Sequence, residues 1–152
     1  ARHGHALLVA VAQVARGDLD PGAERALGEY VKQNMGHDFV FVKDWPFTVR
    51  PFYHMLHEDN PTLTKSFDLL GRGLEITTGA QREHRYEKLA QQALDKGLTL
   101  EPIQNYLNFF RYGCPPHGGL GLGLSRLLMV MLNLPSIRDA VYLFRGPNRL
   151  EP

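Results

Sequence analysis

The feature that most constrains the fold is a hairpin signal near the middle of the chain. Two strand-like runs, residues 66–70 and 74–78, flank a Gly-Arg-Gly segment at 71–73. Glycine at the first position of a two-residue loop suits a type II′ turn, so a turn on the first Gly-Arg pair is predicted. This register sets Asp68 directly opposite Glu75.

Helical and strand patterns lie on both sides of the hairpin. An Asp-Pro pair at 20–21 predicts the start of a helix that ends near Met35, with Gly36 as its cap. Periodicity predicts further segments: helices at 4–16, 85–96, 101–110 and 124–133, a strand at 38–43 buried on both faces, and an extended segment at 47–55. Because helices separate the strands without a parallel βαβ rhythm, the pattern predicts an α+β fold, an antiparallel β-sheet with flanking helices.

Length and composition exclude several classes of protein. The chain has 152 residues, 43% hydrophobic and 22% charged, as expected for one globular domain. A single cysteine excludes a disulfide scaffold, and a net charge of +1 gives no basic field for nucleic acid. No apolar run reaches the roughly 18 residues of a membrane span, and no signal-peptide pattern is present. Because the chain opens on Ala1, we expect it to be a piece of a longer protein.

The predicted pairing of Asp68 with Glu75 has chemical consequences. Like charges directly opposite each other repel. The pair is tolerated if it is exposed to water, shares a proton or holds a cation. Two carboxylates suit Mg²⁺, which takes few protein ligands and keeps water or substrate phosphates around it. A solvated surface pair is the alternative.

A second signal is the run of alternating glycine and leucine at 119–123. Strand alternation puts Gly119, Gly121 and Gly123 on one face, where an absence of side chains lets a flat or bulky ligand approach the backbone. Arg126 follows in the first turn of the predicted helix and is placed to contact a nucleotide. Tight packing of the strand on the helix is the alternative.

Arg82 follows the second hairpin strand. Strict alternation points its side chain away from the Glu75 face, but a bulge near residues 77–79 reverses that parity. With the bulge, the guanidinium could hold an anionic group beside the carboxylates. A surface arginine is the alternative.

Three stretches together resemble a known family. Residues 49–55 (VRPFYHM), 66–84 (SFDLLGRGLEITTGAQREH) and 113–126 (GCPPHGGLGLGLSR) are similar to segments of class II aminoacyl-tRNA synthetases. Within that class the chain resembles the archaeal/eukaryotic-type aspartyl-tRNA synthetases, over residues from about 24 to the C-terminus. His54 stands where the family has threonine, and Ser125 where it has an acidic residue.

The resemblance implies roles for individual residues. Asp68 and Glu75 match acidic residues that hold Mg²⁺ against ATP. The aspartate-binding and catalytic Arg82 matches the arginine that pairs with the aspartate side chain. Thr78 and Gln81 fall in the same pocket. The ATP site is implied to comprise Glu75, Gly119, Gly121, Gly123 and the catalytic Arg126, which matches the arginine that defines the class.

The resemblance also implies a reaction: adenylation of aspartate by ATP, then transfer to tRNA, in a cytoplasmic enzyme that is a homodimer when complete. Residues 1–152 correspond to the C-terminal part of the catalytic domain, because the first two signature motifs and the anticodon-binding domain have no match. We therefore expect the isolated chain to be inactive. The alternative is a stand-alone nucleotide or amino-acid binding module derived from a synthetase. Whether aspartate is attached to one tRNA or also to asparagine tRNA is left open.

Overall fold

The computed structural model describes residues 19–151, so the helix predicted at 4–16 lies outside the described residues. The elements run in the order α1 (Pro21–Met35), β1 (Phe39–Lys43), η1 (Phe47–Val49), β2 (Ser66–Gly71), β3 (Leu74–Gln81), α2 (Tyr86–Asp95), η2 (Glu101–Ile103), α3 (Gln104–Arg111), β4 (Gly118–Leu122), α4 (Leu124–Met131) and η3 (Ile137–Ala140).

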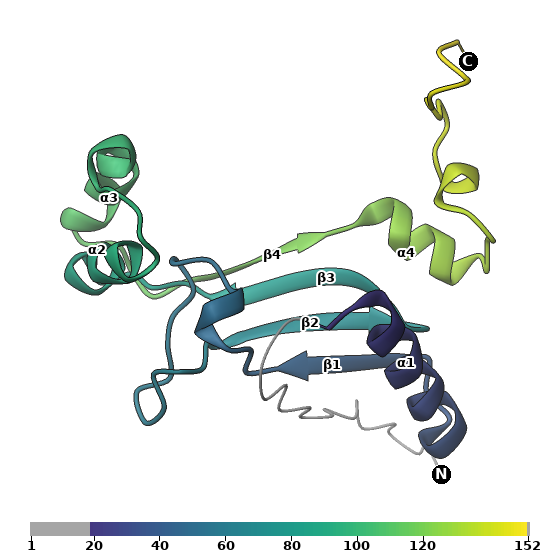
Figure 1. Ribbon diagram of the computed structural model, residues 1–152, viewed down its shortest axis with the longest axis horizontal. Coiled ribbons are helices and arrows are strands. Elements are labelled where there is room, and N and C mark those ends of the chain that lie inside the picture. Colours follow the sequence, from purple (N-terminus) through teal and green to yellow (C-terminus); the bar gives the residue numbers. More distant parts are fainter. Residues whose placement is uncertain (1–18, 152) are drawn as a thin grey trace.

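The predicted antiparallel sheet with flanking helices is confirmed. Four strands pair in the order β1-β2-β3-β4, every neighbour antiparallel. Helix α1 lies across the sheet, whereas α2 and α3 rise at one end and α4 at the other (Figure 1). The helices therefore leave part of the sheet between them open.

The hairpin turn is displaced by one residue from its prediction. The loop is Arg72-Gly73, and both residues have positive φ, 50° and 75°, as a type I′ turn requires. The predicted turn is wrong because α1 packs on the loop: a Cβ on Gly73 would lie 2.7 Å from the Cα of Arg25. Asp68 consequently pairs with Thr78, not with Glu75.

A β-bulge restores part of the predicted arrangement. Leu69 pairs with Thr77 while Leu70 pairs with Glu75, so Ile76 is the extra residue. The bulge lies at Ile76, just before residues 77–79, where the prediction placed it. It reverses the side-chain alternation of β3. Since paired residues share a face, Glu75 still lies on the face of Leu70 and Asp68.

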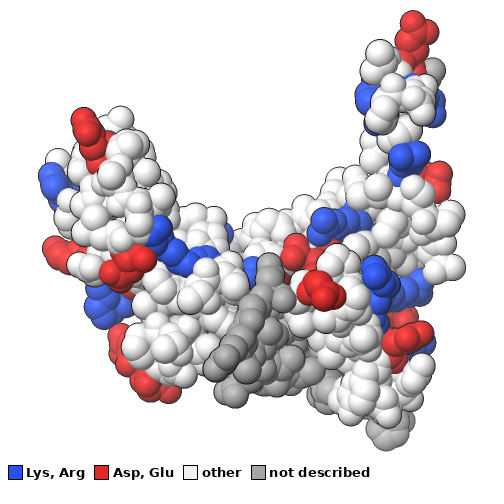
Figure 2. All heavy atoms as spheres, in the orientation of Figure 1, with Lys and Arg blue, Asp and Glu red and all other residues white. Residues whose placement is uncertain are grey.

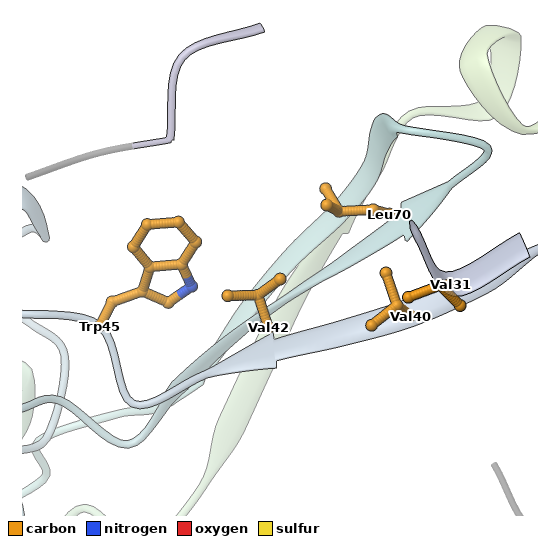
Figure 3. Close-up of a cluster of buried hydrophobic side chains, with 5 residues drawn as sticks. All are labelled: Val31, Val40, Val42, Trp45 and Leu70. Atoms are coloured by element: carbon orange, nitrogen blue, oxygen red, sulfur yellow. The ribbon is translucent and has the colours of Figure 1, made fainter. Parts of the chain in front are cut away.

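The main core lies on the same face, beneath α1. Val31, Val40, Val42, Trp45 and Leu70 form one buried cluster (Figure 3). The prediction that β1 is buried on both faces is wrong, because Phe39 is 36% exposed. On that opposite face Phe41 meets Phe67 edge to face, with ring centroids 5.7 Å apart.

The ends of α1 are as predicted. Asp20 accepts a hydrogen bond of 2.8 Å from the Ala23 amide, and Gly36 closes the helix with φ of 70°. The extended segment predicted at 47–55 is instead the short helix η1, followed by isolated bridges. No helix in the described part of the chain is long and apolar enough to cross a membrane.

Candidate functional site

The face of the sheet on which α1 packs carries, beyond that helix, a row of predicted site residues. Thr78 on β3 pairs with Asp68 on one side and with Gly121 on the other, and Gly119 pairs with Ala80. A Cβ on Gly121 would meet no described atom within 4 Å. The predicted glycine strand is thus confirmed for Gly119 and Gly121, which form a floor with few side chains beside Thr78, whereas Gly123 lies just outside β4.

Gly123 ends this floor at the start of α4. Its amide donates to the Ile76 carbonyl over 2.8 Å, and Arg126 packs against it. Arg126 Nη1 donates to the Glu75 carbonyl over 2.9 Å and lies 3.5 Å from Glu75 Oε1. Arg126 and Glu75, predicted for the same ATP site, are therefore in contact.

Arg82 lies at the other end of the floor. Its amide donates to the His117 carbonyl over 2.9 Å, and its guanidinium lies 4.8 Å from the centroid of the Tyr53 ring. Nη1 is buried and has no hydrogen-bond partner among the described residues. Arg82, Tyr53, Tyr106, Phe110 and Gly119 line a cavity of about 630 Å³. A free guanidinium donor beside a cavity is suited to an anionic ligand.

Gln81 is the predicted residue that does not join this group. Strand alternation puts it on the opposite face of β3 from Ala80. Its backbone bonds to Met55 and Lys65, and so anchors the end of the strand. The structure brings together Thr78, Arg82 and the glycines without the Gln81 side chain.

Asp68 is held by a residue that sequence reasoning missed. Asp68 is 3% exposed, and Arg50 Nη2 contacts its Oδ2 atom. The other oxygen, Oδ1, is buried and finds no partner in residues 19–151. The available signal was an arginine in the stretch at 49–55, but only the fold shows that it reaches β2.

A further carboxylate joins this face from α1. The pKa of Glu24 is raised by burial and by the negative charge of Glu75, while the nearby Arg126 opposes that increase. Glu24 sits in the first turn of a helix, where an acidic residue is common, so its sequence position carried no functional signal.

His54 is 2% exposed and lies near enough to Arg82 and Arg50 for both charges to act on its ring. Burial and the positive charges of Arg82 and Arg50 lower its pKa to about 4, so the imidazole is neutral near pH 7. His54 forms an isolated bridge with Arg82, and its ring contacts Tyr53 with centroids 5.2 Å apart. The sequence marked this position only as a departure from the family.

The site can be compared with what Mg²⁺ requires. Residues 19–151 hold no group of three or more His, Cys, Asp or Glu side chains around one point. Mg²⁺ needs only one or two carboxylates when phosphates and water complete its shell. The buried free oxygen of Asp68, on the same face as Glu75, fits such a role.

Charges of both signs surround the site. Figure 2 shows basic and acidic side chains at the base of the hollow between helices α2 and α3 at one end of the molecule and α4 with the C-terminal segment at the other. Mixed charge of this kind suits a ligand set that combines anions with a cation.

Comparison with known proteins identifies the family. A family model described as tRNA synthetases class II (D, K and N) matches residues 8–145. The chain belongs to this family. It is 52% identical to an aspartate–tRNA(Asp/Asn) ligase of Aeropyrum pernix over 135 residues, which are 89% of this chain and 30% of that protein. An aspartate–tRNA(Asp) ligase of Pyrococcus furiosus is 45% identical, over 89% of this chain and 31% of its own length. This class II chain thus spans about a third of its curated relatives.

Solved synthetases share the fold. An aspartyl-tRNA synthetase of Entamoeba histolytica has a TM-score of 0.85 at 37% identity, over 94% of this chain and 29% of that one. The asparaginyl-tRNA synthetase of Pyrococcus horikoshii complexed with asparaginyl-adenylate has a TM-score of 0.78 at 35% identity, over 90% and 31%. The class II assignment therefore holds for both sequence and fold.

Proposed function

We propose that this chain is the C-terminal part of the catalytic domain of an aspartate–tRNA ligase. The observation that carries the proposal is Arg82, which lines the cavity beside the glycine floor and whose buried Nη1 atom has no hydrogen-bond partner among the described residues. A guanidinium binds a carboxylate through paired hydrogen bonds, and an amide cannot replace both acceptors. The site is therefore suited to aspartate rather than to asparagine or lysine. The high identity to aspartate–tRNA ligases supports this choice.

The remaining site residues divide between the two substrates. Thr78 faces the aspartate pocket with Arg82, and Gly119, Gly121 and Gly123 let ATP lie against the backbone. Arg126, held by Glu75, faces the phosphates. Asp68 and Glu75 would hold Mg²⁺, which when bound offsets the negative charge of the ATP phosphates.

Catalysis on this site consists of positioning and electrostatics. Arg82 holds the aspartate side chain and so leaves the α-carboxylate free to attack the α-phosphorus of ATP. The new O–P bond gives aspartyl-adenylate as pyrophosphate leaves. The terminal ribose hydroxyl of tRNA then attacks the acyl carbon and AMP leaves. Arg126 stabilises the phosphate charge in the first step.

The rest of the proposal concerns the complete enzyme. We place its tRNA-binding surface, its homodimer contact and the remainder of its ATP site outside this chain, and the enzyme in the cytoplasm. The relatives include ligases named for tRNA(Asp) alone and for both tRNA(Asp) and tRNA(Asn), so the proposal covers either. The 152-residue chain alone is expected to be inactive.

The test is pyrophosphate exchange by the complete ligase with aspartate, asparagine or lysine. We expect exchange with aspartate only. In Arg82→Ala we expect aspartate affinity to fall by about 100-fold or more, since a buried charge pair is lost, with ATP affinity within about threefold. Exchange driven equally by asparagine contradicts the proposal. ATP binding with no exchange by the complete protein favours a synthetase-derived binding module.

A further inference from the structure

The most constrained charge pair near the site is the one between Arg50 and Asp68. The two side chains are only 10% and 5% exposed. Arg50 comes from the segment after η1, and Asp68 from the middle of β2, 18 residues away. A buried pair of this kind is costly to break, because the remaining charge is left without compensation.

Arg50 is held in place from two sides. Pro51 follows it, and a residue before proline is restricted to extended backbone; Arg50 has φ −109° and ψ 153°. Its guanidinium also lies over the Trp45 ring, 4.3 Å from the centroid. Trp45 is 2% exposed and belongs to the main core. The core thus provides a rigid platform for Arg50.

The contact with Arg50 leaves the two carboxylate oxygens of Asp68 in different environments. Oδ2 is taken by Arg50, whereas Oδ1 is buried and has no partner within the described part of the chain. Asp68 pairs with Thr78, next to the glycine floor. A carboxylate fixed through one oxygen presents the other in a single direction.

We propose that Arg50 is a positioning residue that orients Asp68, so that Oδ1 alone faces the Mg²⁺ bound with ATP. Arg50 itself touches neither substrate, because Trp45 covers its guanidinium, Asp68 takes its Nη2 atom, and its Nε atom is buried, without a partner among the described residues. The inference rests on the proposed function of the site. Partners that orient a metal ligand typically change metal affinity by about 10- to 100-fold when removed.

Arginine is suited to this task where lysine is not. The planar guanidinium stacks on Trp45 and donates in its own plane to Asp68, whereas an ammonium group is a point charge that cannot do both with the same geometry. Arg50→Lys therefore keeps the charge and loses the orientation.

The test uses the complete ligase, whose wild type serves as reference. Calorimetry with ATP at stepwise Mg²⁺ concentrations gives the half-saturating Mg²⁺ concentration without turnover. We expect Arg50→Gln and Asp68→Asn each to raise that concentration by about tenfold or more. The half-saturating Mg²⁺ concentration of the double variant should be no higher than that of the more strongly affected single variant, since Arg50 acts through Asp68. Aspartate affinity without ATP should stay within about twofold.

Arg50→Lys provides a folded alternative if Arg50→Gln lowers the melting temperature too far, and it should shift the Mg²⁺ dependence in the same direction. Arg85→Lys is the matched control: Arg85 pairs with the buried Glu83 outside the site, so it should cost stability without changing the Mg²⁺ dependence. Independent, additive effects of Arg50→Gln and Asp68→Asn overturn the proposal. So does a loss of aspartate affinity equal to the Mg²⁺ shift, which would place Arg50 on the substrate. A wild type that shows no exchange with aspartate instead defeats the proposed function.

Discussion

The guanidinium of Arg82 lies directly against Gly119. Arg82 Nη2 donates a long hydrogen bond of 3.5 Å to the Gly119 carbonyl, and a Cβ on Gly119 would meet both Nε and Nη2 at 3.4 Å. Gly121, two residues on, has open space above it in the described structure. The two glycines of one strand therefore serve different parts of the site.

This difference predicts that alanine substitutions at Gly119 and Gly121 weaken the binding of different substrates. In the complete ligase, Gly121→Ala should weaken ATP binding by roughly tenfold, because its methyl group fills the floor, and leave aspartate affinity unchanged. Gly119→Ala should bring its methyl group into van der Waals contact with the Arg82 guanidinium, restrict the positions that the guanidinium can take, and so weaken aspartate binding more than ATP binding. Calorimetry with each substrate separates them. Equal losses for both substrates in both variants would contradict this division.

Gly28 is the contact point between α1 and the hairpin. A Cβ on Gly28 would lie 2.6 Å from the Cα of Gly73, so Gly28→Ala must push the helix off the turn. Overpacking costs about 1–3 kcal/mol, more than the gain in helix propensity of up to ~1 kcal/mol. We expect a net loss in urea denaturation of this chain. Glu29→Ala, exposed on the same helix, is the control and should change stability by less than about 0.5 kcal/mol.

The Arg85 pairs allow a comparison of buried and exposed partners. Arg85 Nε lies 2.8 Å from Glu83 Oε1, a side chain that is 1% exposed, and Arg85 Nη1 lies 3.3 Å from Glu58 Oε1, which is 74% exposed. Glu83→Gln should cost about 3 kcal/mol of unfolding free energy, and Glu58→Gln below about 1 kcal/mol. Equal losses in denaturant titration would show that burial does not govern these pairs.

His54 makes stability depend on pH. Its pKa is lowered from 6.5 to about 4 in the folded chain, so between those values the unfolded chain binds more protons. Stability therefore falls as pH decreases from 6.5, and the full loss, up to ~3 kcal/mol, is reached near pH 4. Arg50 and Arg82 are the charged groups facing the ring.

The measurement is urea denaturation between pH 6.5 and 5, above the range where the lowered pKa values of Asp38 and Glu83 contribute. His54→Thr should flatten the decline over this interval. An unchanged slope in His54→Thr would assign the acid sensitivity to other groups.

The hairpin shows how far sequence reasoning reaches. A Gly-Arg-Gly segment allows a turn on either pair, and local propensity alone does not choose between them. The choice is made by α1, which packs on Gly73 from residues about 50 positions earlier. The shift moves Asp68 from Glu75 to Thr78, yet the bulge at Ile76 keeps both carboxylates on one face. The shared face of the two carboxylates was predictable, and the register was not.

The same distinction applies to the site. The glycine floor followed from alternation within one strand, and Arg126 from its position in the next helix turn. Arg50, Glu24 and His54 reach the site from other elements, and their roles depend on burial and on each other's charges. No local pattern encodes such contacts, so these residues were found only through the fold.

Trp45 is the single tryptophan of the 152 residues, and its indole lies beneath the guanidinium that holds Asp68. Trp45, which is buried and contacts Arg50, is consequently the main source of the intrinsic fluorescence of this chain. Moving the Arg50 guanidinium away from the indole ring alters both the intensity and the wavelength of that fluorescence. Trp45 is thus an intrinsic fluorescence probe of the Asp68 environment, and no added label is needed.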